Sequence, residues 1–198
     1  MDHAAHSTGN IIMVGVGGQG IILASEIMSE TALLAGYDVR KSEVHGMAQR
    51  GGSVSSHVRF GETVKSPLIE RGQGNYMLAF EKVEGLRSCD LLRNGATILM
   101  NDVEIIPITV SMGSGTYPDN TESRIRELGF NLIVVDAQEL ARKAGTPKAA
   151  NVVMLASLAS FLDIDRELWL EVIRKRVPQR FLAVNIEAFN LGYEAASQ

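Results

Sequence analysis

Three glycines near the start of the chain, at residues 15, 17 and 20, have the spacing of a dinucleotide-binding fingerprint. They follow the apolar run 11–14 and precede an apolar, helix-periodic stretch over residues 21–35, which predicts a strand, a tight turn and a helix. Free N–H groups at a helix N-terminus bind anions, and glycines let the backbone approach an anion without a Cβ clash. The pattern therefore indicates a site for a ligand phosphate, with a purely structural turn as the alternative. The candidate residues of this site are Gly15, Gly17, Gly18, Gln19 and Gly20.

A second glycine-rich segment, residues 45–52, lies between two predicted strands. Arg50 carries a planar, permanently charged guanidinium that suits phosphate or carboxylate, and the backbone N–H groups of Gly51 and Gly52 can face the same anion. The sequence therefore predicts that Arg50, Gly51 and Gly52 recognise an anion or a partner. The alternative is that the glycines serve a tight turn and that Arg50 pairs with a carboxylate such as Glu43.

The second predicted strand, residues 38–43, argues against an ordinary NAD site at the glycine turn. Beside the first strand of a helix-covered parallel sheet it would be apolar on both faces, yet it consists mostly of charged residues. An NAD site also needs an acid about 20 residues beyond the glycines, at the far end of this strand. Asp38 has that separation but stands at the start of the strand, whereas Glu43 has the position but lies further along. The fingerprint is present without its usual context.

Residue types that would complete an active site are missing from the sequence. The single cysteine, Cys89, excludes an internal disulfide and cannot supply the four thiolates of an iron–sulfur cluster. The sequence has no thiamine diphosphate motif, no Walker lysine, no nucleophile elbow and no cluster with metal-ligand spacing. A catalytic role for His45 is not favoured, because no carboxylate or nucleophile is identifiable beside it. We therefore predict no catalytic residue and no metal ligand in this chain, and we expect any iron–sulfur clusters on another chain.

The bulk composition is that of one globular domain. The chain has 198 residues, of which 45% are hydrophobic and 21% charged, and its net charge of −4 gives no electrostatic reason to expect nucleic-acid binding. No apolar segment approaches the roughly 20 residues that span a bilayer, and the polar start does not have the pattern of a signal peptide. We expect a cytoplasmic protein with a disordered segment over residues 1–9 and a single domain over residues 10–198.

Predicted strands and helices alternate along the chain. Further strands are expected at residues 53–60, 76–80, 96–100 and 131–135, with at most an irregular edge strand over 105–114. Helices are expected over 81–92, near 119, after 136, and through a helical region from 147 that comprises 152–162, 167–176 and 184–196. This order predicts an α/β fold: a Rossmann-like three-layer sandwich with a largely parallel sheet and a C-terminal helical region.

Two long motifs occur in the same order as in a known family. They are residues 15–20 (GVGGQG) and residues 43–52 (EVHGMAQRGG), and together they resemble the gamma subunit or gamma domain of 2-oxoacid:ferredoxin oxidoreductases. The second motif looks most like the small subunit of the indolepyruvate-type enzymes. Asn75 departs from the family, which more often has an aspartate there. Further similarity runs through residues 66–69, 76–81, the strand ending at Asn101, and residues 151–155, so that it covers about residues 10–162.

The resemblance implies a subunit of an enzyme that oxidises a 2-oxoacid to acyl-CoA with release of carbon dioxide and passes the electrons to ferredoxin. It implies an aryl pyruvate such as indolepyruvate as the substrate. In this family, thiamine diphosphate and 4Fe–4S clusters belong mainly to other subunits or domains, so we expect them on a larger partner subunit and no firmly bound cofactor on this chain. The resemblance places the phosphates of coenzyme A, with help from Arg50, against Gly17, Gly18, Gln19 and Gly20.

Two other functions fit the glycine turn. The first is a free-standing Rossmann oxidoreductase, which predicts that the isolated chain binds NAD(P). The second is a non-enzymatic module that senses coenzyme A or a nucleotide, which predicts a stable homo-oligomer without a cofactor-bearing partner.

Overall fold

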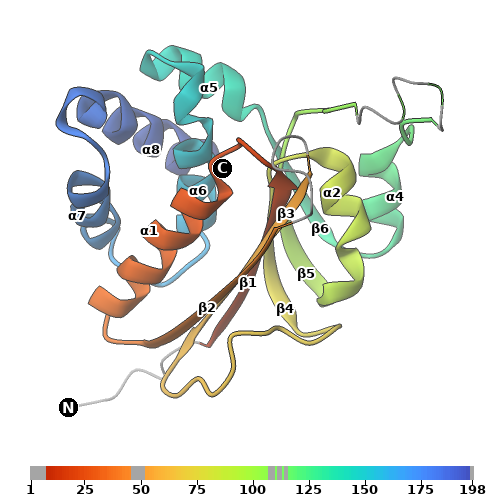
Figure 1. Ribbon diagram of the computed structural model, residues 1–198, viewed down its shortest axis with the longest axis horizontal. Coiled ribbons are helices and arrows are strands. Elements are labelled where there is room, and N and C mark those ends of the chain that lie inside the picture. The colour runs from red at the N-terminus through yellow and green to blue at the C-terminus, as the bar shows by residue number, and fades with distance from the viewer. Residues whose placement is uncertain (1–7, 46–51, 107–109, 111–112, 114–115, 197–198) are drawn as a thin grey trace.

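A single six-stranded sheet forms the centre of the computed structural model, which describes residues 8–45, 52–106, 110, 113 and 116–196 (Figure 1). Its strands are β1 (Gly9–Val16), β2 (Asp38–His45), β3 (Ser53–Gly61), β4 (Gly74–Ala79), β5 (Leu92–Asn101) and β6 (Asn131–Val135). They lie in the order β2-β3-β1-β4-β5-β6. The pairs β1–β4, β4–β5 and β5–β6 are parallel, while β3 is antiparallel to both β1 and β2. The predicted α/β fold with a largely parallel sheet is confirmed.

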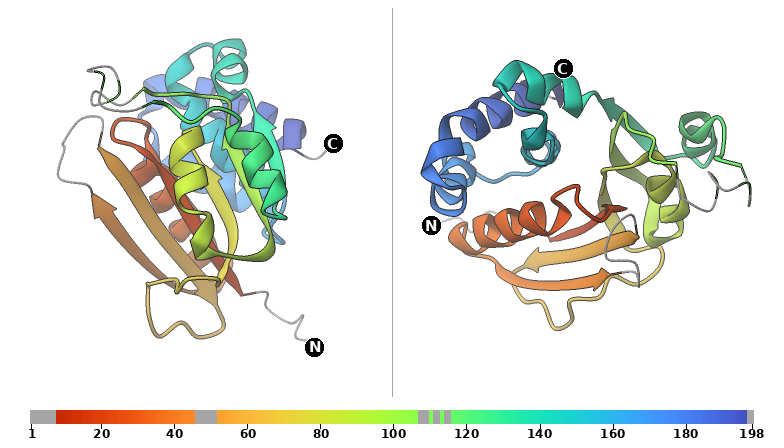
Figure 2. Two further views of the ribbon diagram at one scale, coloured as in Figure 1. Left: turned by 90° about the vertical axis from the view of Figure 1, so that its right-hand side faces the viewer. Right: turned by 45° about the horizontal axis from the view of Figure 1, so that its top comes forward.

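Helices cover both faces of the sheet and complete the three layers (Figures 1 and 2). One face carries α1 (Ile21–Leu34), α5 (Ala137–Ala144), α6 (Ala150–Ala159), α7 (Arg166–Arg176) and α8 (Leu182–Ala196). The other carries α2 (Lys82–Arg87) and α4 (Thr121–Glu127). Short 3-10 turns are η1 (Cys89–Leu91), η2 (Pro147–Ala149) and η3 (Gln179–Phe181). Within the described part of the chain, no helix is both long and apolar enough to cross a membrane.

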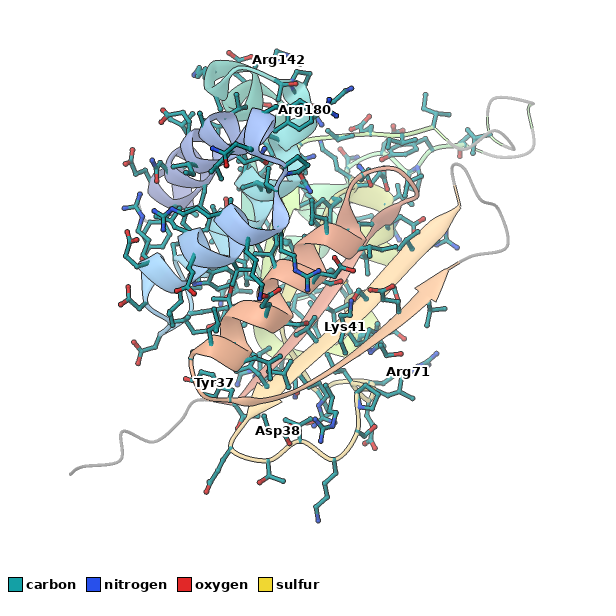
Figure 3. All side chains as sticks on the ribbon, turned by 60° about the vertical axis from the view of Figure 1, so that its left-hand side comes forward. Tyr37, Asp38, Lys41, Arg71, Arg142 and Arg180 are labelled. Carbon is teal, nitrogen blue, oxygen red and sulfur yellow. The ribbon has the colours of Figure 1, made fainter. Side chains whose placement is uncertain are left out.

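The charged second strand is explained by its place at the edge of the sheet. β2 pairs with β3 alone, and β3 separates it from β1. Asp38 and Lys41 lie along this outermost strand (Figure 3), where they form ion pairs with Arg40 at 2.7 Å and Glu43 at 2.6 Å respectively. An edge strand is partly open to water, so its charges remain solvated and also discourage pairing with another chain. The strand beside β1 is therefore the antiparallel β3, which has no counterpart in an NAD-binding sheet.

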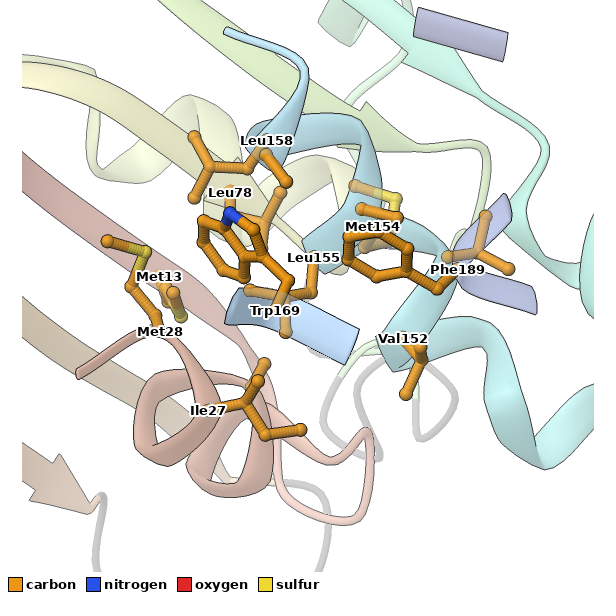
Figure 4. Packing of buried hydrophobic residues seen from close by; sticks show 14 of the residues in the cluster. Met13, Ile27, Met28, Leu78, Val152, Met154, Leu155, Leu158, Trp169 and Phe189 are labelled. Carbon is orange, nitrogen blue, oxygen red and sulfur yellow. The ribbon is translucent and has the colours of Figure 1, made fainter. Parts of the chain in front are cut away.

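Side chains of β1 alternate between two hydrophobic cores. Ile11 and Met13 pack toward α1 and the C-terminal helices, whereas Ile12 and Val14 pack toward α2 and α4. This is the period of two that a strand covered on both faces requires. Trp169 of α7 is fully buried in the first core, where Figure 4 shows it between side chains of α1, α6 and the sheet. The two cores fix β1, and with β1 the glycine turn that follows it.

Two predicted boundaries in the middle of the chain are wrong. The helix expected over residues 81–92 ends at Arg87, and its first predicted residue, Glu81, is instead the cap that accepts a hydrogen bond from the Glu84 N–H at 2.8 Å. The strand expected at residues 96–100 begins earlier, at Leu92, and Gly95 lies inside it with a φ of 71°, where the register to β4 shifts. The glycine therefore distorts the strand without ending it.

Most other predicted elements are confirmed. The helices expected in the C-terminal region correspond to α6, α7 and α8, and the helix expected near residue 119 begins at Thr121. Asp136 caps α5 by accepting a hydrogen bond from the Glu139 N–H at 2.9 Å. β1 begins at Gly9, the last residue of the segment expected to be disordered, while residues 1–7 lie outside the described part. Most of the segment 105–114 is likewise outside it.

Candidate functional site

The glycine turn connects the carboxyl end of β1 to the N-terminus of α1. Gly18 has a φ of 99° and Gly20 a φ of 79°, in the left-handed region that favours glycine. Gly20 is the N-cap of α1, which has no side-chain cap. The N–H groups of Gly18 and Gly20 have no acceptor among the residues that the structure describes. The turn therefore presents free donors and the positive end of the helix to an anion.

Gln19 holds the turn together from within. Its Oε1 accepts a hydrogen bond from the Val16 N–H at 2.7 Å, and its Nε2 donates to the Phe80 carbonyl oxygen, also at 2.7 Å. Gly15 leaves room for this side chain, because a Cβ at residue 15 would lie 2.6 Å from Gln19 Oε1 and 2.8 Å from Phe80 Cβ. Gly15 and the side chain of Gln19 thus shape the turn, and Gln19 also lines the pocket above it.

The two loops predicted to act together do meet in space. The Gly17 N–H donates a hydrogen bond to the Gly52 carbonyl oxygen at 3.0 Å. This contact follows from the antiparallel pairing of β1 with β3, which places Val16 opposite Ser53. Arg50 and Gly51, like the side chain of His45, lie outside the described residues. The Gly17 N–H is therefore occupied by protein, and Gly18 is the glycine with open space above it.

A pocket of about 200 Å³ lies over the glycine turn and is lined by Gly18, Gln19, Asn101, Lys148 and Asn151 among others. Asn101 accepts a hydrogen bond from the Ala137 N–H at 3.2 Å, and the side-chain amide of Asn151 donates to the Gly20 carbonyl oxygen at 3.4 Å. Lys148 is exposed and forms no ion pair with any described residue. This lysine is a free positive charge on the wall of an anion-sized pocket.

Sequence reasoning assigned no role to Asn101, Lys148 or Asn151. Asn101 and Asn151 stand in segments that carried the family resemblance, and Asn101 follows a predicted strand at the edge where the glycine turn opens. This position of Asn101 is the sequence feature that could have indicated its place in the site. Lys148 follows a proline at the start of a helical region, and nothing in its sequence context distinguishes it from other surface lysines. Its place in the pocket results from how α5 and α6 are connected.

Charged residues next to the pocket form hydrogen bonds and ion pairs with the segment that follows β5. The carboxylate of Glu81 is 1% exposed and accepts hydrogen bonds from the Ile105 N–H at 3.2 Å and the Tyr117 hydroxyl at 2.5 Å. Burial first, and this contact second, raise the pKa of Tyr117. Lys82 pairs with Asp102 at 2.6 Å, which is the main reason that its pKa is raised. These groups are fully engaged and offer no free acid or base.

Two residues with chemically useful side chains are also engaged in structure. His57 Nδ1 accepts a hydrogen bond from the Ile69 N–H at 3.2 Å, and burial lowers the pKa of the imidazole. The Cys89 thiol is 6% exposed and donates to the Gly85 carbonyl oxygen at 3.4 Å. Burial, with a smaller contribution from Asp90, raises its pKa to about 11. In the described ranges, no three His, Cys, Asp or Glu residues are grouped so that they could hold a metal ion.

The two candidate ribose-binding acids are engaged by other groups of the protein. Asp38 accepts a hydrogen bond from the Val64 N–H at 2.9 Å in addition to its ion pair with Arg40. Glu43 is bound to Lys41. Both acids stand on β2, which β3 separates from β1. The sheet therefore lacks the arrangement in which an acid at the end of the second strand faces a nucleotide on the first turn.

Comparison with known proteins supports the family resemblance that the two glycine-rich motifs indicated. A family model described as pyruvate ferredoxin/flavodoxin oxidoreductase matches residues 10–195. The chain belongs to this family. Among curated proteins of the pyruvate ferredoxin/flavodoxin oxidoreductase type, the indolepyruvate oxidoreductase subunit IorB of Pyrococcus horikoshii is 43% identical over 194 residues, which is 96% of each chain. The resemblance to gamma-type subunits is thus confirmed.

Solved structures of this family share the fold. The gamma subunit of a keto/oxoacid ferredoxin oxidoreductase from Geobacter sulfurreducens is 25% identical, with a TM-score of 0.71 over 95% of this chain and 98% of that one. A 2-oxoglutarate:ferredoxin oxidoreductase from Magnetococcus marinus, solved with 2-oxoglutarate, coenzyme A and succinyl-CoA, is 20% identical with a TM-score of 0.74. It matches over 96% of this chain but only 31% of its own. The same fold therefore occurs both as a separate subunit and within a longer chain.

Proposed function

We propose that this chain is the small, IorB-type subunit of a 2-oxoacid:ferredoxin oxidoreductase that acts on an aryl pyruvate such as indolepyruvate. The observation that carries the proposal is the 43% identity to an indolepyruvate oxidoreductase subunit along almost the full length of both chains. In the proposed complex, a larger partner subunit holds thiamine diphosphate and 4Fe–4S clusters, and ferredoxin receives the electrons. Residues 10–198 act in it as one domain, and a cytoplasmic location stays a prediction.

The role that we propose for this chain is to hold the phosphates of coenzyme A at the glycine turn. The N–H groups of Gly18 and Gly20 supply donors, and the absence of any described atom within 4 Å of a Cβ built on Gly18 leaves room for an oxygen of the ligand. Lys148 supplies positive charge in the lining of the pocket, and in the proposed site the Arg50 guanidinium and the Gly51 backbone N–H group add to the binding of the anion. Contacts of this kind with charged groups contribute about 1.5–3 kcal/mol each.

The arrangement of this site divides its residues into two groups. Gly15 and Gln19 set the shape of the turn, and Gly17 with Gly52 joins it to the second loop. Gly18 and Gly20 then remain as the backbone donors for a ligand. This division narrows the set of residues that we propose to contact coenzyme A.

The NAD(P)-binding alternative is not favoured, because the antiparallel β3 stands where an NAD site requires the second parallel strand.

The sensing-module alternative differs from the proposed function in the assembly that it predicts. A gamma-type subunit has a cofactor-bearing partner, whereas a sensor is a homo-oligomer that carries its ligand alone. The state of the protein in its own host therefore separates the two.

The test is a gentle affinity purification of the tagged chain from its host, with identification of the co-purifying proteins and analysis for iron, acid-labile sulfide and thiamine diphosphate. We expect one larger partner that contains all three. The purified complex is then assayed with indolepyruvate, coenzyme A and a viologen acceptor, with the isolated chain and a reaction lacking coenzyme A as controls. A cofactor-free homo-oligomer, or turnover by the isolated chain, would overturn the proposal.

A further inference from the structure

A second pocket, of about 390 Å³, lies on the helical side of the molecule, away from the sheet edge. It is bordered by the first turn of α1, the connection from α5 to α6, the link from α7 to η3, and the start of α8. Its apolar wall is formed by Leu23, Ala149, Val177, Pro178, Phe181 and Val184. Its volume falls in the range of small-molecule sites, which are mostly apolar with a few placed polar groups.

The aromatic ring of Phe181 is an exposed part of this wall. Phe181 is 44% exposed, whereas Val177 in the same wall is 7% exposed. Its carbonyl oxygen accepts a hydrogen bond from Asn185 Nδ2 at 2.8 Å. This bond orients the amide of Asn185, which also lines the pocket, and leaves its Oδ1 as an acceptor. An exposed ring next to an oriented amide is suited to a flat ligand.

The charges around the pocket are positive. Lys148 lines it, and the guanidinium carbon of Arg180 lies 4.7 Å from the centre of the Phe181 ring. Neither cation forms an ion pair with a residue in the described ranges, whereas Arg176, also in the wall, is neutralised by Glu26 and Glu30. Two uncompensated cations beside an apolar pocket are notable in a chain of net charge −4, and they favour a negatively charged ligand.

We propose that this pocket is a second ligand site, which takes an anion with a flat apolar body. The ring system lies against Phe181 and Val184, and the anionic group lies toward Lys148 and Arg180. Two sources of such an anion are present during the proposed reaction. One is coenzyme A, whose adenosine 3′,5′-bisphosphate end combines a flat ring system with phosphates. The other is an aryl carboxylate related to the substrate. The site is distinct from the glycine turn, because among the described residues the two pockets share only Lys148 and Asn151.

The test is calorimetric titration of the full chain with adenosine 3′,5′-bisphosphate and, separately, with indole-3-acetate. Neutral adenosine and indole at equal concentration show whether the anion is needed. The decisive variant is Val184→Phe, which fills the second pocket and lies outside the lining of the glycine-turn pocket. Lys148→Gln removes the shared charge, and Lys143→Gln, an exposed lysine on α5 that lines neither pocket, is its matched control.

We expect one of the two anions to bind, and we expect Val184→Phe and Lys148→Gln each to weaken it about tenfold or more while Lys143→Gln leaves it unchanged. Which anion binds identifies the source of the ligand. If Val184→Phe does not fold, judged by its melting temperature, Phe181→Ala replaces it, since Phe181 is partly exposed and its truncation removes less buried contact. Failure of both anions to bind at about 1 mM, or binding that the pocket variants leave unchanged, overturns the proposal. Since these titrations need no partner subunit, their result does not depend on the proposed oxidoreductase function.

Discussion

Gln19 Nε2 donates a hydrogen bond of 2.7 Å to the carbonyl oxygen of Phe80, and this bond joins the glycine turn to the end of the neighbouring parallel strand. The other end of the same amide accepts from the Val16 N–H. One side chain therefore closes the turn and also ties it to the sheet. A glutamine in a glycine-rich loop is easily taken for a ligand-binding residue, and here its two hydrogen bonds give it a structural role.

Replacing Gln19 with leucine should lower the free energy of unfolding by about 1–2 kcal/mol, because the Val16 N–H loses its acceptor. The Phe80 carbonyl oxygen is less affected, since it also accepts a hydrogen bond from Asn101 at 3.4 Å. Urea unfolding followed by circular dichroism measures the change. Gln138→Leu is the control: Gln138 lines the same pocket but makes no side-chain hydrogen bond with a described residue. Equal stability of the two variants would contradict the assigned role.

Arg50→Ala tests the proposed coenzyme A site in the assembled enzyme. Loss of a charge-assisted contact worth about 1.5–3 kcal/mol should raise the KM for coenzyme A roughly ten- to a hundredfold, while the KM for the 2-oxoacid stays the same. Steady-state kinetics with each substrate varied in turn measures both constants. An unchanged KM for coenzyme A with a weaker complex would place Arg50 in the subunit interface instead.

Cys89 should be unreactive in the folded protein. Its pKa is raised from 9.0 to about 11, so the thiolate fraction at pH 8 is about a hundredfold below that of an ordinary cysteine. Alkylation by iodoacetamide should therefore be at least about a hundredfold slower in buffer than in urea, and since the chain has one cysteine the signal is unambiguous. Because folding favours the protonated thiol, this contribution to stability is complete below pH 9 and is lost as the pH rises toward 11. Fast alkylation of the folded chain would argue for an exposed, reactive thiol.

Gly192→Ala should be strongly destabilising, because a Cβ at residue 192 would lie 2.3 Å from the Val153 carbonyl oxygen, where α8 crosses α6. Ser157 strengthens this crossing by donating to the Gly192 carbonyl oxygen at 3.1 Å. We expect a loss of about 3 kcal/mol, at the upper end for an overpacked contact. Ala183→Ser on the exposed side of α8 serves as the control, with an expected change within about 0.5 kcal/mol. Near-equal melting temperatures would show that the helices can move apart without cost.

The sequence predicted where the strands and helices lie along the chain better than it predicted which strands pair in the sheet. A continuous apolar run identified β1, alternation of apolar residues identified β3, and the C-terminal helices followed from their own periodicity. The insertion of β3 between β1 and β2 was not predictable in this way, because pairing depends on contacts between segments far apart in the chain. The charges of Asp38 and Glu43 did indicate that β2 is not an ordinary central strand. They did not indicate which strand takes that place.

The candidate site was predicted in part, for a similar reason. The glycines of the turn carry a local signal, since positive φ angles at Gly18 and Gly20 restrict those positions to few residue types. Lys148 and Asn151 carry no such signal, because they reach the turn only through the packing of α6 against α1. Glycine also has two different functions within this motif: Gly15 leaves space for the Gln19 side chain, and Gly18 leaves an open approach for a ligand. Only the structure distinguishes these two functions.

The register between β1 and β3 determines where this protein can change length during evolution. Val16 lies opposite Ser53, and this pairing brings Gly52 to Gly17. One residue inserted in β3 would shift the second loop by one position. It would also turn buried side chains such as Val58 toward the opposite face of the sheet. The insertion would therefore destabilise both the glycine turn and the hydrophobic core. Residues 62–73, between β3 and β4, lie at the opposite end of β3 from the glycine turn. Insertions in relatives should therefore accumulate there, and β3 itself should keep a constant number of residues.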